Sequence, residues 1–173
     1  MRHRLSGIRA RAISLLKKND LFRAPVDVVA LAERLGLTVV LEELDDDVSG
    51  LLMVKGGKAI IVVNAEHHPN RQRFTAAHEL AHYALHNSGA DHLFVDRKVF
   101  FRDEAAATGE DVQEIEANKF AAELLMPKAL LGQALEDENI DLLDDFDVHR
   151  LARKFKVSEQ ALGFRLASLQ LIS

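Results

Sequence analysis

The feature that most constrains this chain is the segment FTAAHELAHYALH at residues 74–86, which holds three histidines at four-residue spacing. Small and apolar residues surround these histidines, so the segment predicts a buried helix. Residues four apart lie on one face of a helix, and His78 and His82 can therefore direct two imidazoles at one point. Buried histidines need polar partners, and a metal ion provides one.

Glu79 follows the first histidine and completes the pattern His-Glu-x-x-His. In this pattern the two histidines bind zinc, and the glutamate is the general base of a metalloprotease. His86 lies two turns from His78, about 12 Å along the axis, because a helix rises about 1.5 Å per residue. Zinc–nitrogen bonds are about 2 Å long, so His86 cannot join the same ion from one straight helix. The competing interpretation is a helix with incidental surface histidines.

A third ligand has to come from another element, and residues 110–126 predict a helix with four glutamates: Glu110, Glu114, Glu116 and Glu123. Glu114 shares its helix face with two alanines and Asn118, which are small enough for two helices to approach closely. Glu116 lies on a different face, nearer to Phe120. This facing favours Glu114 as the ligand, with Glu116 as the alternative. Asn118, one turn further on, is placed to hydrogen-bond a liganding histidine.

The rest of the first 70 residues predicts an alternation of helices and strands. Residues 8–18 and 25–36 have helical spacing. Pro25 is expected to begin the second of these helices and Gly36 to cap its end. Its apolar residues are expected to be buried: Val28, Val29, Leu31, Ala32 and Leu35.

Three apolar and β-branched runs predict strands, at residues 37–41, 49–54 and 59–63. Gly56 and Gly57 predict a tight hairpin turn between the last two. The strand at 59–63 is interpreted as an edge along which an extended peptide could lie. Polar residues 64–70, which include Pro69, predict a loop before the histidine helix.

The second half of the chain is less uniform. Residues 88–109 show no assignable pattern, and a loop of that length is often functional. Residues 128–136 continue as a possible helix. In the tail, one short helix is expected to end near Phe155, and Ser158 is expected to cap a second helix. The two helices together resemble a helix-turn-helix.

Composition narrows the functional classes. The 173 residues include no cysteine, so histidine, aspartate and glutamate must supply any metal ligands. The net charge is −5, which gives no indication of a nucleic-acid binder. The basic residues 1–18 and the acidic residues 136–147 are interpreted as solvated faces. The sequence shows neither a signal peptide nor an apolar run of transmembrane length, and we expect a soluble, cytoplasmic protein.

The segments RQRFTAAHELAHYALH and EIEANKFAAELLMP, in this order, resemble the ImmA/IrrE family of metallopeptidases. The likeness covers nearly the whole chain. It implies an α+β, zincin-like peptidase domain at residues 1–127, with a small antiparallel or mixed sheet and an active-site helix. A helix-turn-helix-like helical region follows at residues 128–173.

The resemblance also implies the chemistry of the site. Members of the family bind zinc through the His-Glu-x-x-His helix and a glutamate of the Glu-x-x-Ala-Asn helix. Carried over, the ligands of Zn²⁺ are His78, His82 and Glu114, and Glu79 is the catalytic base. The expected activity is that of an endopeptidase that cleaves a helix-turn-helix repressor protein and so relieves repression.

The oxyanion of the transition state is expected to be stabilised by zinc and by one further donor. That donor stays unassigned. Tyr83 is next to a ligand in sequence, but is expected to point elsewhere. The candidates are His86, His92 and His149, and each of them is more readily explained as a surface or loop histidine.

Two rival functions remain open. One is an inactive zincin-like module whose tail binds DNA or protein, since the tail carries basic residues: Arg150, Arg153, Lys154, Lys156 and Arg165. The acidic run before the tail and the acidic whole chain disfavour DNA. The other is a component of a toxin–antitoxin pair without catalysis. No membrane partner is expected.

Overall fold

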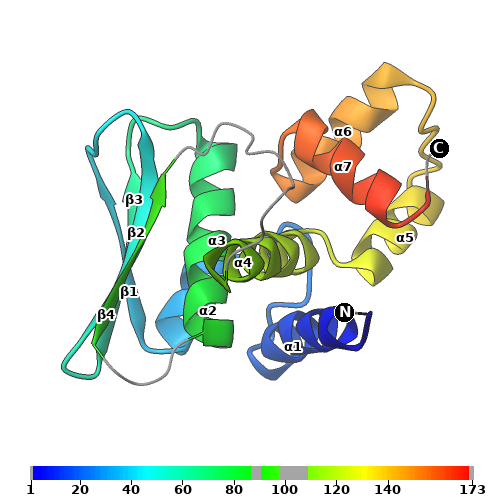
Figure 1. Cartoon of the computed structure of the whole chain (residues 1–173). Helices are drawn as coiled ribbons and strands as arrows, with labels where there is room; N and C mark the ends of the chain where they lie inside the picture. The colour runs from blue at the N-terminus through cyan, green and yellow to red at the C-terminus, as the bar shows by residue number, and fades with distance from the viewer. Residues whose placement is uncertain (1, 87–90, 98–108, 172–173) are drawn as a thin grey trace.

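The computed structural model describes residues 2–86, 91–97 and 109–171, and within these ranges the chain forms seven helices and four strands (Figure 1). They follow the chain in the order α1 Arg2–Lys18, α2 Val28–Arg34, β1 Leu37–Glu42, β2 Val48–Lys55, β3 Lys58–Asn64, α3 Pro69–His86, β4 His92–Arg97, α4 Gly109–Leu125, α5 Lys128–Asp137, α6 Asp145–Phe155 and α7 Glu159–Ser168. The fold is α+β with one small mixed sheet, as the sequence predicts. No helix in the described ranges has the length and hydropathy that a membrane span requires.

The four strands form one mixed sheet in the order β1-β3-β2-β4. β1 runs parallel to β3, whereas β2 is antiparallel to both β3 and β4. The interpretation of residues 59–63 as an edge strand is therefore wrong, because β3 lies inside the sheet between β1 and β2. Its continuous apolar run is typical of an interior strand. The edge next to β2 is instead β4, which lies within residues 88–109, where no element is predicted. Residues 88–90 and 98–108 of that stretch lie outside the described residues.

The hairpin between β2 and β3 turns at two glycines, as predicted. Gly56 and Gly57 have φ angles of +56° and +76°. A two-residue turn with positive φ at both positions matches the right-handed twist of the strands, and glycine adopts it without steric cost. The turn brings Lys55 opposite Lys58 at the end of the ladder.

The start of α2 differs from the prediction. Asp27, and not Pro25, starts the helix: its side chain accepts a 2.9 Å hydrogen bond from the backbone N–H of Ala30. This bond satisfies one of the free N–H groups of the first turn. Val29 is 44% exposed, so the prediction that it is buried is wrong. Gly36 follows the last helical turn with a φ angle of +86°, which suits its expected role at the helix end.

Helix α3 covers one face of the sheet and begins at Pro69, within the segment predicted as a loop. Gly50 on β2 allows this close packing. A Cβ atom at Gly50 would lie 2.5 Å from Cγ2 of Thr75 on α3 and 2.8 Å from the carbonyl oxygen of Val62. Helix α4 packs on the other side of α3 (Figure 1). Four fully buried alanines lie on these two helices: Ala77 and Ala81 on α3, and Ala117 and Ala121 on α4.

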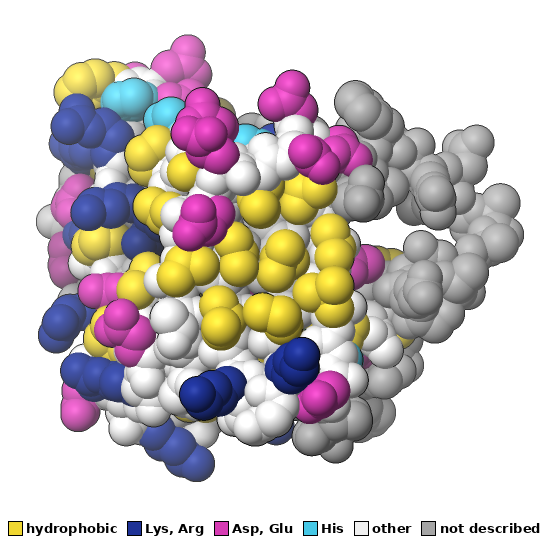
Figure 2. Space-filling view, turned by 90° about the vertical axis from the view of Figure 1, so that its left-hand side faces the viewer, with side chains coloured by type: hydrophobic (Ala, Val, Ile, Leu, Met, Phe, Trp, Pro, Cys, Tyr) yellow, Lys and Arg dark blue, Asp and Glu magenta, His cyan; other side chains and the backbone are white. Residues whose placement is uncertain are grey.

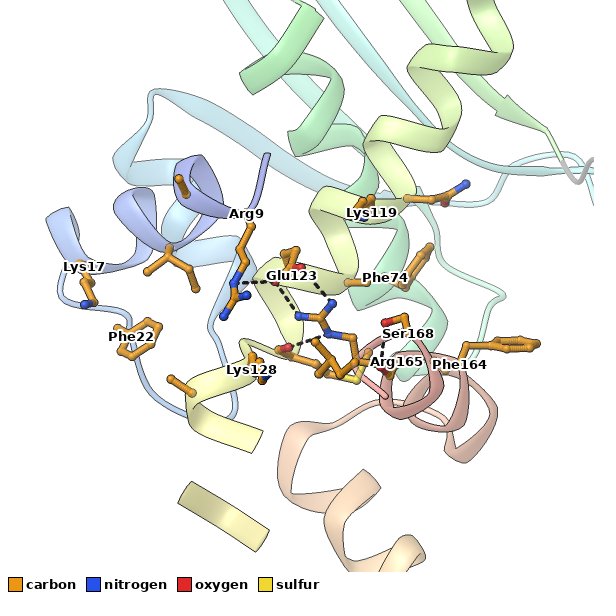
Figure 3. A pocket seen from close by; sticks show the side chains of 18 residues that line it. Arg9, Lys17, Phe22, Phe74, Lys119, Glu123, Lys128, Phe164, Arg165 and Ser168 are labelled. Carbon is orange, nitrogen blue, oxygen red and sulfur yellow. Dashed lines mark hydrogen bonds and ion pairs between the residues drawn. The ribbon is translucent and has the colours of Figure 1, made fainter. Parts of the chain in front are cut away.

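The tail consists of α6 and α7, and its capping follows the sequence. The Ser158 hydroxyl accepts a 3.1 Å hydrogen bond from the backbone N–H of Ala161, as predicted for an N-cap. Arg165 of α7 is buried, and its guanidinium forms a bidentate pair with Glu123 of α4, at 3.0 and 2.6 Å (Figure 3). Its Nε donates to the carbonyl oxygen of Met126. These bonds fix α7 against α4. The division at residue 127 stays a prediction.

Candidate metal centre

Three side chains from two helices converge between α3 and α4. His78 and His82 project from successive turns of α3, and Glu114 projects from α4. The Nε2 atoms of the two histidines lie 3.1 Å apart. Oε2 of Glu114 lies 3.1 Å from Nε2 of His78, and its Oε1 lies 3.2 Å from Nε2 of His82. Both histidines are buried, whereas the Glu114 side chain is 46% exposed and leaves the centre open on one side.

This geometry fits a small divalent cation. Four ligands arranged tetrahedrally at about 2.0–2.1 Å from zinc lie about 3.3 Å from one another. The three separations of 3.1–3.2 Å in the cluster agree with this spacing. Two imidazole nitrogens and one carboxylate also leave a fourth position for a small molecule, as in catalytic sites. The residues present therefore fit a bound metal ion.

A further contact orients the first histidine. Nδ1 of His78 lies 3.1 Å from Oδ1 of Asn118 on α4, one turn beyond Glu114. If the amide oxygen accepts, Nδ1 carries the proton and Nε2 presents its lone pair to the cluster. This contact is the one that the sequence predicts for Asn118. The ring of His82 stacks on that of Phe94 of β4, at 4.7 Å between centroids.

Glu79 lies beside the three converging side chains and is fully buried. Neither of its carboxylate oxygens has a hydrogen-bond partner among the described residues. Burial raises the pKa of Glu79 to about 8; His78 opposes this rise, and Asp96 and Glu114 add to it. A carboxyl group in such an environment can hold a proton near neutral pH, which suits a group that takes up and releases one.

Asp96 of β4 is a member of the centre that the sequence analysis missed. One oxygen of Asp96 lies within 4.8 Å of ligand atoms of both His78 and Glu79. Burial is the main cause that raises the pKa of Asp96. Side chains of a strand point alternately to its two faces, and in the segment HLFVDR this places His92, Phe94 and Asp96 on one face. This pattern is the sequence signal that could have indicated Asp96. That segment lies in the stretch for which no strand is predicted.

The charges around the two histidines are mostly negative. Burial alone would raise the pKa of Glu114, but its hydrogen bonds to His78 and His82 and their charges lower it well below its usual range. Burial lowers the pKa of His78, yet the bond to Glu114 and the nearby carboxylates raise it overall. With Glu79 and Asp96, three carboxylates surround two imidazoles. Such a cluster favours a cation.

Comparison with known proteins assigns the chain to a family. Residues 32–167, well over half of the chain, match the model of a peptidase family described as the IrrE N-terminal-like domain. The chain belongs to the ImmA/IrrE family. This is a family of metallopeptidases, so membership implies a metal ion, and the histidine–glutamate cluster can hold one.

Individual relatives agree with this assignment. The chain is 29% identical over 118 residues to an uncharacterized immunity region protein of Bacillus phage phi105, and the match covers 68% of each chain. It is 38% identical over 77 residues to the radiation response metalloprotease IrrE of Deinococcus radiodurans, a match that covers 44% of this chain and 22% of that protein. Over 113 residues it is 34% identical to IrrE of Deinococcus deserti, covering 62% of this chain and 36% of the relative. The matches thus span about a fifth to a third of the two IrrE proteins.

The other candidate ligands of this ImmA/IrrE protein lie elsewhere. Glu116 is buried beside His86, with 3.8 Å between its Oε2 and Nε2 of His86. Glu123 is engaged by Arg165, and the side chain of Glu110 lies outside the described residues. Of Glu114, Glu116 and Glu123, whose side chains the structure describes, Glu114 is the one that contacts both His78 and His82. Its role as a ligand stays a prediction, as do those of His78 and His82.

The candidate oxyanion donors are also dispersed. The ring of His86 lies 5.7 Å from that of His82, centroid to centroid, and the His92 ring packs edge-on against Phe94. His149 lies on α6 and pairs with Glu159 at 2.6 Å, with more than half of each side chain exposed. The contact with Glu159 accounts for the position of His149, so this residue needs no role at the metal centre.

Proposed function

We propose that this chain is a zinc-dependent endopeptidase. The observation that carries the proposal is the convergence of His78, His82 and Glu114 beside a buried carboxylate, Glu79, that has no hydrogen-bond partner among the described residues. Membership of a metallopeptidase family supports it. Zinc is the preferred ion, because two imidazoles and one carboxylate with an open fourth position are ligands typical of catalytic zinc.

The chain's own residues divide the work of peptide hydrolysis. When bound, zinc supplies Lewis acidity, which acidifies water and polarises a carbonyl group. Glu79 accepts the proton that the attacking water loses. It then donates this proton to the amine nitrogen of the leaving fragment as the C–N bond breaks. Asn118 holds the His78 ring in place throughout, because it engages the nitrogen opposite to the one that faces the cluster.

Two features suit a polypeptide substrate. The first is β4, an edge strand that carries Asp96 next to Glu79. Within the described residues β4 pairs only with β2, so its other side can receive an extended peptide. The second is a cavity of about 970 Å³ whose lining includes Phe74 and Asn118, both neighbours of His78. It continues between α1, α4 and α7, with mostly apolar walls, and could hold substrate side chains.

The proposed substrate is a helix-turn-helix repressor protein, whose cleavage relieves repression. The resemblance of nearly the whole chain to the ImmA/IrrE family supports this choice. The names of the relatives, an immunity region protein and two radiation response metalloproteases, are compatible with a regulatory role.

DNA binding by the tail is not favoured, because three of its five basic residues pair with glutamates of the protein. Arg165 is buried against Glu123, and Lys154 and Arg150 both contact Glu138. These pairs reduce the charge available for phosphate contacts.

The test is cleavage of a purified helix-turn-helix repressor encoded beside this gene, by the zinc-loaded protein and its Glu79→Gln variant. The unmodified protein should cut the repressor into two fragments, whereas Glu79→Gln should keep its metal and lose about 10²–10⁴-fold in rate. Glu136→Gln, a change of an exposed glutamate, serves as the matched control. An intact repressor with fully loaded protein would favour the inactive module, and cleavage by Glu79→Gln at the normal rate would remove Glu79 from the mechanism.

A further inference from the structure

The sheet has a second face, which no described helix covers. In Figure 1 the helices lie on one side of the sheet, and the opposite side faces outward. The strand register places the outward side chains in two rows across the four strands. One row is Val40, Val62, Leu51 and Val95, and the other is Thr38, Ile60, Met53 and Leu93. Seven of these eight side chains are apolar.

These rows form a continuous apolar patch, visible in the centre of Figure 2. Leu93, Val95 and Met53 are 60%, 42% and 37% exposed, and the remaining apolar members are half-buried by their neighbours. Scattered apolar side chains are normal on a protein surface, whereas a contiguous apolar patch of a few hundred Å² is often functional. We call it the outer patch.

Opposite charges flank the outer patch at the two ends of the strands. Lys55 and Lys58 face each other at the hairpin end, and both are exposed. Glu42 closes β1 at the other end, and the loop at residues 43–47 adds further carboxylates, among them Asp45. In Figure 2 the basic side chains lie below the yellow patch, together with an acidic side chain, and acidic side chains lie above it. Asp91 is at the hairpin end, where its Oδ1 accepts a hydrogen bond from the backbone N–H of Gly56, so the lysines exceed the carboxylates there without excluding them.

We propose that the outer patch binds a second copy of this chain, face to face. The two copies are related by a two-fold axis that lies in the plane of the interface and runs perpendicular to the strands. Rotation about this axis places the first apolar row of one copy on the second apolar row of the other copy. The same rotation exchanges the strand ends. Lys55 and Lys58 of each copy then meet the acidic end of the other, so the surface is complementary to itself in both hydrophobicity and charge.

The size of the patch sets the expected strength. Four strands about 4.8 Å apart and about six residues long give a face of roughly 400 Å² in projection. A standard interface buries about 800 Å² per partner, so the dimer is expected to be weak, with a Kd on the order of 10–100 µM. This inference does not depend on the proposed peptidase activity.

Sedimentation velocity over roughly 1–300 µM protein tests it, because this range spans the expected Kd. The unmodified chain should shift from monomer to dimer. Met53→Lys should weaken the association at least about tenfold, as a buried charge at the centre of an interface does. Arg153→Glu, an exposed change on α6, should leave it unaltered. A chain that stays monomeric throughout, or a dimer that Met53→Lys does not weaken, overturns the proposal.

A charge exchange tests whether the charged ends of two copies pair with each other, without touching the apolar rows. The variant Lys55→Glu with Lys58→Glu should associate less with itself, as should Glu42→Lys with Asp45→Lys. Mixing the two variants should restore association, since each basic end again meets an acidic end in the heterodimer. If the mixture associates no better than either variant alone, the antiparallel face-to-face dimer is wrong.

Discussion

The two faces of the sheet carry different kinds of side chains, although both are formed by the same strands. On β4, Phe94 and Asp96 point inward, where Phe94 stacks on His82 and Asp96 lies near Glu79. The alternate residues, Leu93 and Val95, point outward and are exposed. One face therefore buries polar groups within a tightly packed layer, and the other exposes apolar groups to solvent. Because side chains alternate along a strand, the same strand can support a rigid site and an association surface that are altered independently.

The largest expected effect comes from the inner face. His82→Ala should remove a proposed metal ligand and reduce the proposed peptidase activity by at least about 10³-fold, because both the metal and the water it would acidify are lost. Elemental analysis and a cleavage assay measure the two effects. His149→Ala is the matched control, since His149 pairs with Glu159 on the tail, and its activity should be normal. Equal loss in both variants would mean that histidine removal acts through folding.

A smaller effect is expected at Asn118, which contacts the ring of His78. Asn118→Ala should weaken metal affinity about 10–100-fold, the usual cost of losing the hydrogen bond that orients a liganding histidine. Competition with a chelator of known affinity measures the change. Asn118→Asp keeps an acceptor oxygen and should retain most of the affinity. If the alanine variant binds metal as tightly as the original chain, the contact between Asn118 and His78 has no orienting role.

The packing of α3 on the sheet can be tested at Gly50. A methyl group there would lie 2.8 Å from the carbonyl oxygen of Val62 as well as against Thr75, and this backbone atom cannot move aside easily. Gly50→Ala should therefore cost about 1–3 kcal/mol of unfolding free energy, as measured by urea denaturation. Gly132→Ala on α5 is the control: nothing lies within 4 Å of its Cβ, and alanine should stabilise that helix. A neutral Gly50→Ala would contradict the close approach of α3 to the sheet.

The smallest effect is expected on the outer face. Val95→Thr preserves the shape of an exposed side chain and should change the unfolding free energy by no more than about 0.5 kcal/mol. Peptidase activity should stay the same, because residue 95 points away from the centre. Phe94→Ala, its immediate neighbour on the inner face, should lower both stability and activity. Similar losses in the two variants would remove the distinction between the faces.

Local patterns in the sequence predict much of this arrangement. Helical spacing alone directs His78 and His82 to one side of a helix, and the facing of Glu114 brings it to them in the structure. The hairpin glycines and the cap at Ser158 follow in the same way, because each depends on a few neighbouring residues. The identity of the ion and the ligand roles remain predictions.

Features that depend on distant pairing were not predictable in this way. β4 is a short strand that pairs with β2 across about 40 positions of sequence, and without it the order of the sheet could not be inferred. Asp96 is missed because no strand is predicted there, and the prediction places β3 at an edge because the parallel pairing of β3 with β1 has no local signal. Arg165 illustrates the same limit: its charge suggests contact with phosphate, but its partner is Glu123, 42 residues earlier in the chain.

The central claim is that His78, His82 and Glu114 together hold one divalent ion, and metal content measures it most directly. Elemental analysis of purified, dialysed protein should find about one zinc per chain in the original protein and in Glu116→Gln, and almost none in Glu114→Gln. Loss of zinc at Glu116→Gln with retention at Glu114→Gln, or an original protein that binds no divalent metal at all, would contradict the account.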